Sequence, residues 1–156
     1  MKFVFLKVES SKEKWSEEVS SLYLEKLKYF IKFEIHTLNS KKIARAGASQ
    51  KKELESQEIL DFLEKDDFVI LFDESGRALD SLAFSNQVSR VLDTGKKRCV
   101  WIIGGAFGVS ENVKKRADLR LSLAQFVMNH LVAQTVALEQ IYRAFTIIKN
   151  LPYHNH

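Results

Sequence analysis

The sequence predicts an α/β fold in which a mostly parallel sheet carries helices on both faces. The strongest indication is a pair of continuous apolar runs, Phe68–Phe72 and Cys99–Ile103, which are typical of strands buried on both sides. Segments of strand character also alternate with segments of helical character, as expected for parallel strands joined by helices. With 156 residues, 46% of them hydrophobic and 28% charged, the chain has the size and balance of one domain over residues 1–156.

The first half of the chain predicts two strands and two helices. Lys2–Val8, rich in Phe and Val, is expected to be a strand, and Lys32–Leu38 alternates apolar and polar residues as a second strand would. Ser10 and Glu13 form a capping-box pattern, which predicts that a helix begins there, between the two strands. One line along this helix holds Trp15, Val19, Leu22, Lys26 and Tyr29, and the line beside it holds Tyr23, Leu27 and Phe30. After the polar stretch Asn39–Ser49, a second helix is expected around Gln50–Leu63.

The second half predicts three further strands and three helices. The run Phe68–Phe72 is a buried strand that the turn Asp73–Gly76 ends, and Cys99–Ile103 is the next strand. A helix marked by Ala83, Phe84, Val88, Val91 and Leu92 lies between them and stops at Gly95. A glycine loop then leads to a short helix capped by Ser110, with Glu111 in its first turn. The chain ends with a strand at Leu119–Ala124 and its longest helix at Asn129–Lys149.

The last helix is apolar around much of its circumference. One apolar stripe would pack on the sheet, and a second needs another surface to cover it. A partner subunit would supply that surface, which favours a homodimer. The alternative is a helix that is buried within the monomer. The apolar positions are Leu131, Val132, Val136, Leu138, Ile141, Tyr142, Phe145 and Ile148.

The charge pattern favours an anionic partner. The formal net charge is +4, and basic residues gather in three separate clusters. Each cluster alone could be a solvated surface, but three in one small domain indicate a nucleic-acid footprint. The clusters are Lys41-Lys42 with Arg45 and Lys51-Lys52, then Lys96-Lys97-Arg98, then Lys114-Lys115-Arg116.

Several classes of protein are not expected. Cys99 is the one cysteine, so no intrachain disulfide forms, and it is expected to be a small buried hydrophobe rather than a reactive thiol. No secretory signal is visible and no apolar run approaches the ~20 residues of a membrane helix, so a cytoplasmic protein is expected. The four histidines lack ligand-like spacing with carboxylates, so no metal site is expected.

Three segments could carry chemistry. Gly104–Gly108 follows a buried strand and precedes a capped helix, where glycines allow close backbone approach to a ligand, although a tight structural turn is an equal alternative. Asp73–Gly76 also follows a buried strand and could line the same pocket or be a simple turn. In the tail, Tyr142-Arg143 and Leu151–His156 combine residues suited to stacking on a base or binding phosphate, with a histidine, the residue type that titrates near neutral pH.

These segments occur together in a known family. The sequence resembles, over essentially its full length, the SPOUT-class methyltransferases called RlmH, which methylate N3 of a pseudouridine in large-subunit (23S) ribosomal RNA. The matching pieces are Phe72-Asp73-Glu74-Ser75-Gly76, Ile103-Gly104-Gly105 with Gly108, Leu121-Ser122, His130, Glu139-Gln140-Ile141-Tyr142-Arg143-Ala144-Phe145, and Pro152-Tyr153-His154.

The resemblance implies a carboxy-terminal trefoil knot, a homodimer, and S-adenosylmethionine bound in the knot. By position, the cofactor would be contacted by Phe72, Gly104 and Gly105, and by a third segment before the last helix, made of Ala124, Gln125, Phe126, Val127, Met128 and Asn129. The RNA base would be contacted by His130, Arg143, Tyr153 and His154, with the tail reaching across the dimer.

The chain departs from the family pattern at three places. The usual Thr-Leu/Phe-Pro-His stretch reads Val127-Met128-Asn129-His130, an arginine is replaced by Gln134, and an aliphatic residue of the cofactor pocket is replaced by Phe72. In the expected reaction, N3 attacks the sulfonium methyl, His154 accepts or relays the N3 proton, and Arg143 stabilises the N3 anion. Two alternatives are an RNA-binding relative without turnover, and a flavodoxin-like nucleotide or signalling module.

Overall fold

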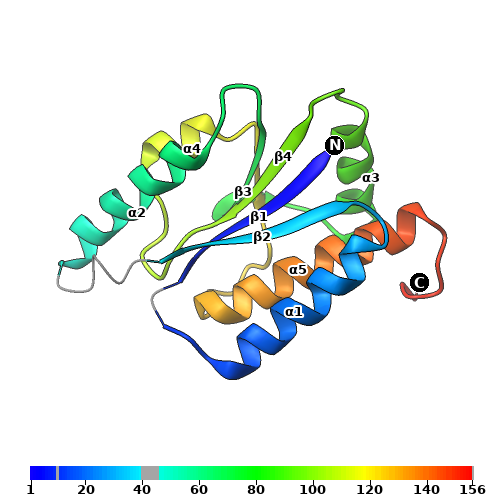
Figure 1. Cartoon of the computed structure of the whole chain (residues 1–156), viewed down its shortest axis with the longest axis horizontal. Helices are drawn as coiled ribbons and strands as arrows, with labels where there is room; N and C mark the ends of the chain where they lie inside the picture. Colours follow the sequence, from blue (N-terminus) through cyan, green and yellow to red (C-terminus); the bar gives the residue numbers. More distant parts are fainter. Residues whose placement is uncertain (10, 40–45, 156) are drawn as a thin grey trace.

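The computed structural model describes residues 1–9, 11–39 and 46–155, and its core is one five-stranded sheet. The strands are β1 (Lys2–Glu9), β2 (Lys32–Asn39), β3 (Phe68–Ala78), β4 (Arg98–Ile103) and β5 (Leu119–Ser122). All neighbouring pairs are parallel, in the order β2-β1-β4-β3-β5 (Figure 1). The predicted α/β class is therefore confirmed, and the sheet is fully parallel. The trefoil knot stays a prediction.

Helices cover both faces of this sheet, as predicted. The helices α1 (Lys14–Lys28), α3 (Ser81–Leu92) and α5 (His130–Ile148) pack together on one face, with α5 between the other two. The helices α2 (Ala48–Phe62) and α4 (Glu111–Arg116) lie together on the opposite face (Figure 1). The predicted positions agree with these bounds to within a few residues, except at the end of β3.

The alternation of side chains along β1 explains why both faces need helices. Phe3 and Phe5 point into the core on the α1/α5 face, and Val4 and Leu6 point into the core on the α2/α4 face. All four are at most 2% exposed. Because truncation of a buried Phe costs about 3–5 kcal/mol, each face contributes substantially to stability. The continuous apolar runs that predicted this fold are the direct signature of a strand buried on both sides.

The beginning of α1 differs from the prediction, and its buried face follows one of the two lines named from the sequence. The helix starts at Lys14 with Glu13 as its N-cap, which makes no side-chain capping bond, and Ser10 lies outside the described residues. Of the predicted apolar line, Trp15 is 43%, Leu22 is 51% and Tyr29 is 88% exposed. The helix instead buries its neighbouring line, which ends at Leu27 and contains serines. Tyr23, Leu27 and Phe30, the second line named from the sequence, are in the core or pack against it, and Ser16 and Ser20 are buried as well.

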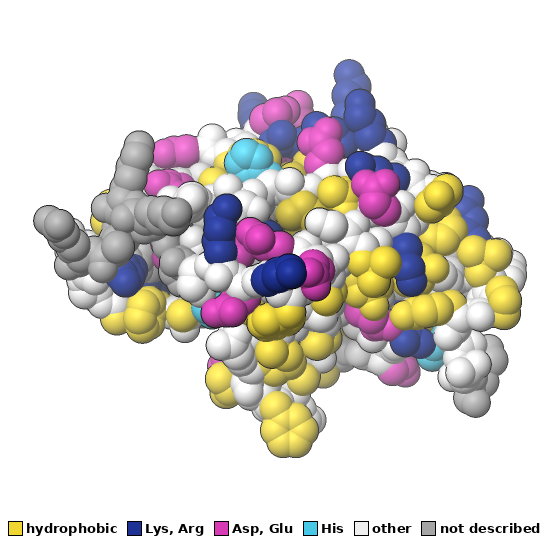
Figure 2. Space-filling model, turned by 60° about the horizontal axis from the view of Figure 1, so that its bottom comes forward, with side chains coloured by type: hydrophobic (Ala, Val, Ile, Leu, Met, Phe, Trp, Pro, Cys, Tyr) yellow, Lys and Arg dark blue, Asp and Glu magenta, His cyan; other side chains and the backbone are white. Residues whose placement is uncertain are grey.

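The apolar circumference of α5 is largely covered within the chain. Leu138 and Ile141 are fully buried, since α5 packs against the sheet and against both α1 and α3. This is the alternative that the sequence left open, a helix buried in the monomer. The exposed apolar side chains of this face lie mainly on α1, and hydrophobic side chains are visible among charged ones where this face comes forward in Figure 2.

The structure also bears on the predictions for the cysteine, for membrane helices and for the first basic cluster. Cys99 is fully buried in β4, and this burial raises the pKa of its thiol, as expected for a core residue rather than a reactive one. Among the residues that the structure describes, no helix has the length and apolar character to cross a membrane. The first basic cluster is described only in part, because Lys41, Lys42 and Arg45 lie outside the described residues.

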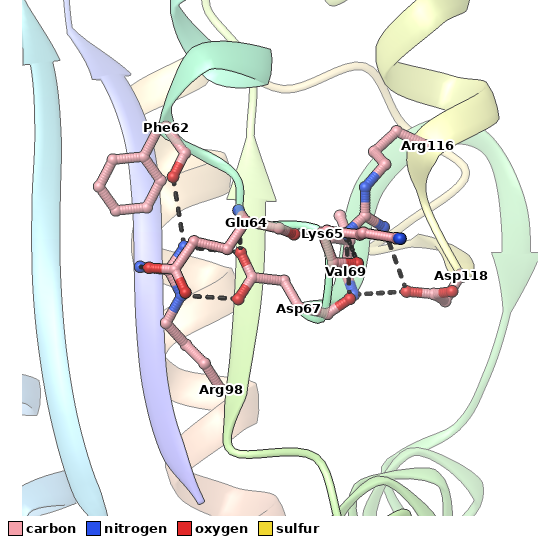
Figure 3. Close-up of polar contacts among 8 residues, drawn as sticks. All are labelled: Phe62, Glu64, Lys65, Asp67, Val69, Arg98, Arg116 and Asp118. Carbon is pink, nitrogen blue, oxygen red and sulfur yellow. Dashed lines mark hydrogen bonds and ion pairs between the residues drawn. The ribbon is translucent and has the colours of Figure 1, made fainter.

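A buried carboxylate joins the amino ends of β3 and β4, at the edge of the sheet shown in Figure 3. The Asp67 side chain is 1% exposed and accepts hydrogen bonds from Nε and Nη2 of Arg98 at 2.7 and 2.6 Å. Its second partner is the backbone N–H of Glu64 at 2.8 Å. This contact with Asp67 raises the pKa of Arg98. Arg116, from α4, donates to the backbone oxygens of Glu64 and Asp67 and so attaches that helix to the same edge.

We predict that Asp67→Asn destabilises the protein by about 2–4 kcal/mol, because Arg98 loses its buried anionic partner and keeps only the exposed Glu64, whose Oε1 lies 3.0 Å from its Nη1. Urea unfolding followed by circular dichroism measures the difference. Asp66→Asn is the matched control, since Asp66 is exposed and adjacent, and it should change stability by less than about 0.5 kcal/mol. Equal stability of the two variants would contradict this account of the network.

Candidate functional site

One cleft of about 540 Å³ lies at the carboxyl ends of β3 and β4 and at the start of α5. Three segments that are distant in the sequence meet there: the bulge after Phe72, the glycine loop Gly104–Val109, and the segment Ser122–His130. Parallel strands bring these loops together, because their carboxyl ends share one edge of the sheet. The expected convergence of the two glycine-containing loops and the entry to α5 is therefore present.

The first segment is a bulge inside β3 rather than a turn that ends the strand. Phe72 and Arg77 both pair with Leu121 of β5, so Asp73–Gly76 are extra residues that loop out toward the cleft. Gly76 allows this close crossing, because a Cβ there would lie 2.6 Å from the backbone N and C of Leu121. Bulges of this kind redirect side chains at the edges of sites. The predicted turn thus becomes a bulge, and β3 continues to Ala78.

Phe72 forms the floor of the cleft. It is 7% exposed, lines the cavity, and stacks on Trp101 with ring centroids 5.8 Å apart. Phe84 from α3 contacts the same Trp101 ring edge-on at 5.7 Å. The Phe72 ring is bulkier than the aliphatic side chain of the family pattern. It packs among aromatic side chains of the core and leaves the cleft open.

The second segment places glycine backbone against the cavity. Gly104 and Gly105 line it directly, and a Cβ at Gly104 would lie 2.7 Å from Cγ1 of Val109. The loop closes with a hydrogen bond from the N–H of Gly108 to the oxygen of Gly105 at 3.0 Å, and Gly108 has a φ of +73° that favours glycine. The loop therefore offers bare backbone for close contact with a ligand.

The third segment completes the cleft with exposed apolar residues. Ala124 and Met128 line the cavity, whereas Gln125 does not. Phe126 is 84% and Val127 is 79% exposed at the rim. This exposure is unusual for side chains of that size and leaves an apolar lip beside the cavity.

Asn129 and His130 lie where this segment enters α5. Asn129 lines the cleft, and its Oδ1 accepts the N–H of Leu131 at 2.9 Å, so the residue that replaces the family's proline caps the helix. His130 is the first residue of the helix and also lines the cleft. Its Nε2 is buried and has no hydrogen-bond partner among the described residues. A ligand that offers a polar atom there would satisfy it.

Two lysines at the mouth of the cleft were not predicted as site residues, whereas Asp73 and Glu74 belong to the segment that was expected to line the pocket. Lys52 and Lys114 line it together with Asp73 and Glu74. Lys114 is partly neutralised, because its Nζ lies 3.3 Å from Glu111 and 3.8 Å from Asp73. Both lysines belong to the basic clusters seen in the sequence, which gave the only signal for them. The mouth therefore combines cations suited to an anionic polymer with carboxylates suited to a cationic group.

Arg143, Tyr153 and His154 do not line this cleft. They form a separate group at the carboxyl end of α5, called here the tail group, in which Glu139 accepts hydrogen bonds from Arg143 and from the Tyr153 hydroxyl at 3.0 Å. The Arg143 guanidinium lies 4.8 Å from the Tyr153 ring centre, and its Nη1 is 3.4 Å from Nδ1 of His154. The tail is thus ordered against the helix, away from the cavity of its own chain.

The tail group has perturbed acid–base properties. The hydrogen bond to Glu139 raises the pKa of Arg143, which keeps the guanidinium charged. Burial, followed by hydrogen bonds with Tyr23 and Glu139, raises the pKa of Tyr153, so its phenol stays protonated at neutral pH. Tyr153 can therefore act as a hydrogen-bond donor there, and not as a base. The i,i+4 spacing of Glu139 and Arg143 was the sequence signal for this contact.

Gln134 is also outside the cleft. It is 1% exposed and its Nε2 donates to the backbone oxygen of Val8 at 3.2 Å. The residue that replaces the family's arginine thus joins α5 to the end of β1. Among the described residues, no group of three or more His, Cys, Asp or Glu could hold a metal ion.

A parallel sheet with a cleft at the ends of two adjacent strands and a final helix that enters it is the arrangement of a SPOUT methyltransferase. The family model described as "Predicted SPOUT methyltransferase" matches residues 1–154, and the chain belongs to that family. The fold of a probable methylase family protein from Haemophilus influenzae Rd KW20 aligns over 99% of this chain and 70% of that chain, with a TM-score of 0.51 and 12% identity, which supports the fold alone.

Curated relatives define the branch of this family. The chain is 54% identical over 99% of both chains to a Bdellovibrio bacteriovorus protein named ribosomal RNA large subunit methyltransferase H. It is 39% identical to a protein of the same name from Christiangramia forsetii, over 89% of both chains. The chain is therefore a member of the ribosomal RNA large subunit methyltransferase H family, RlmH, as the resemblance of its motifs indicated.

We predict that Gly76→Ala destabilises the protein by about 2–4 kcal/mol, because the added Cβ meets the backbone of Leu121 and backbone atoms cannot rotate away. Thermal unfolding measures the loss. Ser75→Ala, a neighbouring exposed position, removes only its bond to Asp73 and should cost less than about 1 kcal/mol. A Gly76→Ala protein as stable as the parent would show that the bulge does not need this close approach.

Proposed function

We propose that this protein transfers a methyl group from S-adenosylmethionine to large-subunit (23S) ribosomal RNA, at N3 of a pseudouridine. The convergence of Phe72, the glycine loop and the entry to α5 in one cleft carries this proposal. Membership of the RlmH family supports it, since the relatives' printed name gives the large-subunit ribosomal RNA as their target. A ribosomal substrate also implies a cytoplasmic location.

The cleft has features that fit S-adenosylmethionine. Gly104 and Gly105 present bare backbone where a Cβ would collide with neighbouring atoms, and the cavity is large enough for a nucleoside. Phe72 would lie under the adenosine part of the ligand. Ala124 and the residues from Phe126 to Asn129 would contact it from the α5 side, whereas Gln125 faces away from the cavity and is not proposed as a contact.

The chemistry asks mainly for alignment and removal of one proton. S-adenosylmethionine, when bound, supplies a methyl group that its sulfonium charge activates. His154 takes the N3 proton, and the guanidinium of Arg143 stabilises the negative charge left on the base. Tyr153 keeps its phenol proton, which suits its raised pKa, and donates it in a hydrogen bond to the base once the O–H turns away from Glu139. His130, at the cleft, orients the base toward the methyl group.

The proposed reaction requires two chains. Within one chain the tail group lies outside the cleft, so a partner must bring its own tail group to that cleft. We therefore propose a homodimer in which each active site combines the cleft of one subunit and the tail group of the other. Support comes from the apolar lip at Phe126 and Val127 and from the exposed apolar line on α1, which are surfaces that a second subunit would cover.

The two departures that suggested a non-catalytic relative have structural roles. Asn129 caps α5, and Gln134 is buried against Val8. Neither change closes the cleft or removes a contact of the tail group, so this alternative has no observation in its favour. The flavodoxin-like alternative is replaced by membership of the SPOUT family.

Mass spectrometry of 23S ribosomal RNA from cells with and without the gene tests the function. We expect an N3-methylpseudouridine in the parent that is absent from the deletion strain and returns when the gene is restored. Identical modification profiles in the three samples would contradict the proposal. Isothermal titration of the purified protein with S-adenosylmethionine tests the cofactor separately.

We predict that Arg143→Ala lowers methyl transfer to ribosomes by at least about a hundredfold, as expected when one charge-stabilising group is lost. Its affinity for S-adenosylmethionine should stay within about twofold of the parent, because Arg143 lies outside the cleft. Arg90→Ala, which changes an exposed arginine on α3, is the control and should be fully active. Transfer of tritiated methyl groups and calorimetry measure the two quantities.

Mixed dimers test the shared active site. A Gly105→Val subunit, in which the added side chain collides with Glu55 and displaces the glycine loop of the cleft, and an Arg143→Ala subunit should each be inactive alone. Mixed in equal amounts, they form hybrid dimers with one intact site, so about a quarter of the parental activity should return. No recovery, with both variants folded and dimeric by sedimentation, would place each complete site within one chain.

A further inference from the structure

One face of α2 contacts the glycine loop from behind. Lys52, Glu55 and Ser56 have the i, i+3, i+4 spacing that places side chains on the same face of a helix. Lys52 reaches the cleft. Glu55 and Ser56 are polar but only 4% and 1% exposed, so the fold holds them away from water at a cost. The proposed transfer reaction gives neither residue a role.

These two buried residues contact opposite ends of the loop. At its start, Glu55 lies against Gly105, since a Cβ built there would be 2.6 Å from Oε2 of Glu55. At its end, Oγ of Ser56 accepts the N–H of Ser110 at 2.8 Å, in a fully buried hydrogen bond. Adjacent residues of one helix on the α2/α4 face of the sheet thus pack against the start of the loop and hydrogen-bond to the residue that follows its end.

The loop needs such external contacts because its own sequence favours many conformations. Gly104, Gly105 and Gly108 each have more backbone freedom than other residues, and ordering them costs conformational entropy. A ligand that binds to a disordered loop pays that cost on binding, whereas a loop fixed beforehand spares it. A fixed loop therefore binds more tightly.

We propose that Glu55 and Ser56 are positioning residues that hold the glycine loop in its binding conformation and so set the affinity for the methyl donor. This inference rests on the proposed cofactor site. The carboxylate fills the space that the missing side chain of Gly105 leaves, and the Ser56 hydroxyl accepts the N–H of Ser110, where the loop passes into α4.

Single substitutions test the two contacts by calorimetry with S-adenosylmethionine. Ser56→Ala leaves the buried N–H of Ser110 without a partner, and Glu55→Ala empties the space behind Gly105, so each should weaken binding by about tenfold. Glu55→Gln keeps the shape and should restore affinity to within about threefold. Glu53→Ala is the matched control, because Glu53 is an exposed glutamate on the same helix and should leave affinity unchanged.

A double substitution tests the contact between Glu55 and Gly105. Gly105→Ala alone places its Cβ against the Glu55 carboxylate and should weaken binding by at least about tenfold. In the Glu55→Ala background the same change should cost less than about threefold, because the obstructing group is gone. Kinetics give a second measure: the KM for the donor should rise in the single variants while kcat at saturation changes little.

The outcomes separate this inference from the proposed function. If the parent does not bind S-adenosylmethionine, the proposed cofactor fails and this inference with it. If the parent binds and the Glu55 and Ser56 variants bind equally well, only the inference is overturned. Additive losses in the Glu55/Gly105 pair would also overturn it. A general loss of structure would lower ribosome affinity together with donor affinity, whereas a positioning role lowers donor affinity and leaves ribosome affinity unchanged.

Discussion

The fully parallel arrangement of the sheet is the constraint on which the site depends. Because β3 and β4 run in the same direction side by side, the loops that leave them emerge at one edge, and the start of α5 is brought to the same place. Burial of both faces of the sheet makes this geometry rigid, since each central strand contacts helices on either side. The amino ends of β3 and β4 are joined through Asp67 and Arg98, so the opposite edge is fixed as well. The loops of the site can then have irregular conformations without loss of stability in the sheet.

The fold followed from the sequence because its signals are local. The runs at Phe68–Phe72 and Cys99–Ile103 are typical of strands buried on both sides, and alternation with helices then favoured the parallel pairing that the structure has. For α1 the sequence offered two adjacent apolar lines, and the structure buries the one that holds Leu27 and small serines, while Trp15 on the other line is 43% exposed. That choice depends on how closely the helix approaches the sheet, which is a tertiary property that periodicity does not report.

The site was predicted in part, and the missing part is non-local. The position of glycines after buried strands located the cleft, and family motifs added Phe72 and the entry to α5. The bulge in β3 arises from the crossing of Gly76 over β5, two segments 45 residues apart in the sequence. Glu55 lies on an ordinary polar helix, where nothing in the sequence distinguishes it from solvated neighbours, and Lys52 of the same helix was marked only as part of a basic cluster. Their relevance comes only from the contact of α2 with a loop in the second half of the chain.

The aromatic stack beneath the cleft gives this protein an internal optical reporter. Trp101 is fully buried directly behind Phe72, while Trp15, the other of the two tryptophans, is 43% exposed on α1. An indole in the core emits at shorter wavelength than one in water, so the two contributions to the fluorescence spectrum are separable. A movement of Phe72 at the floor of the cleft changes the surroundings of Trp101, and so its short-wavelength emission. Occupancy of the cavity can therefore be followed on the native chain, with no attached dye.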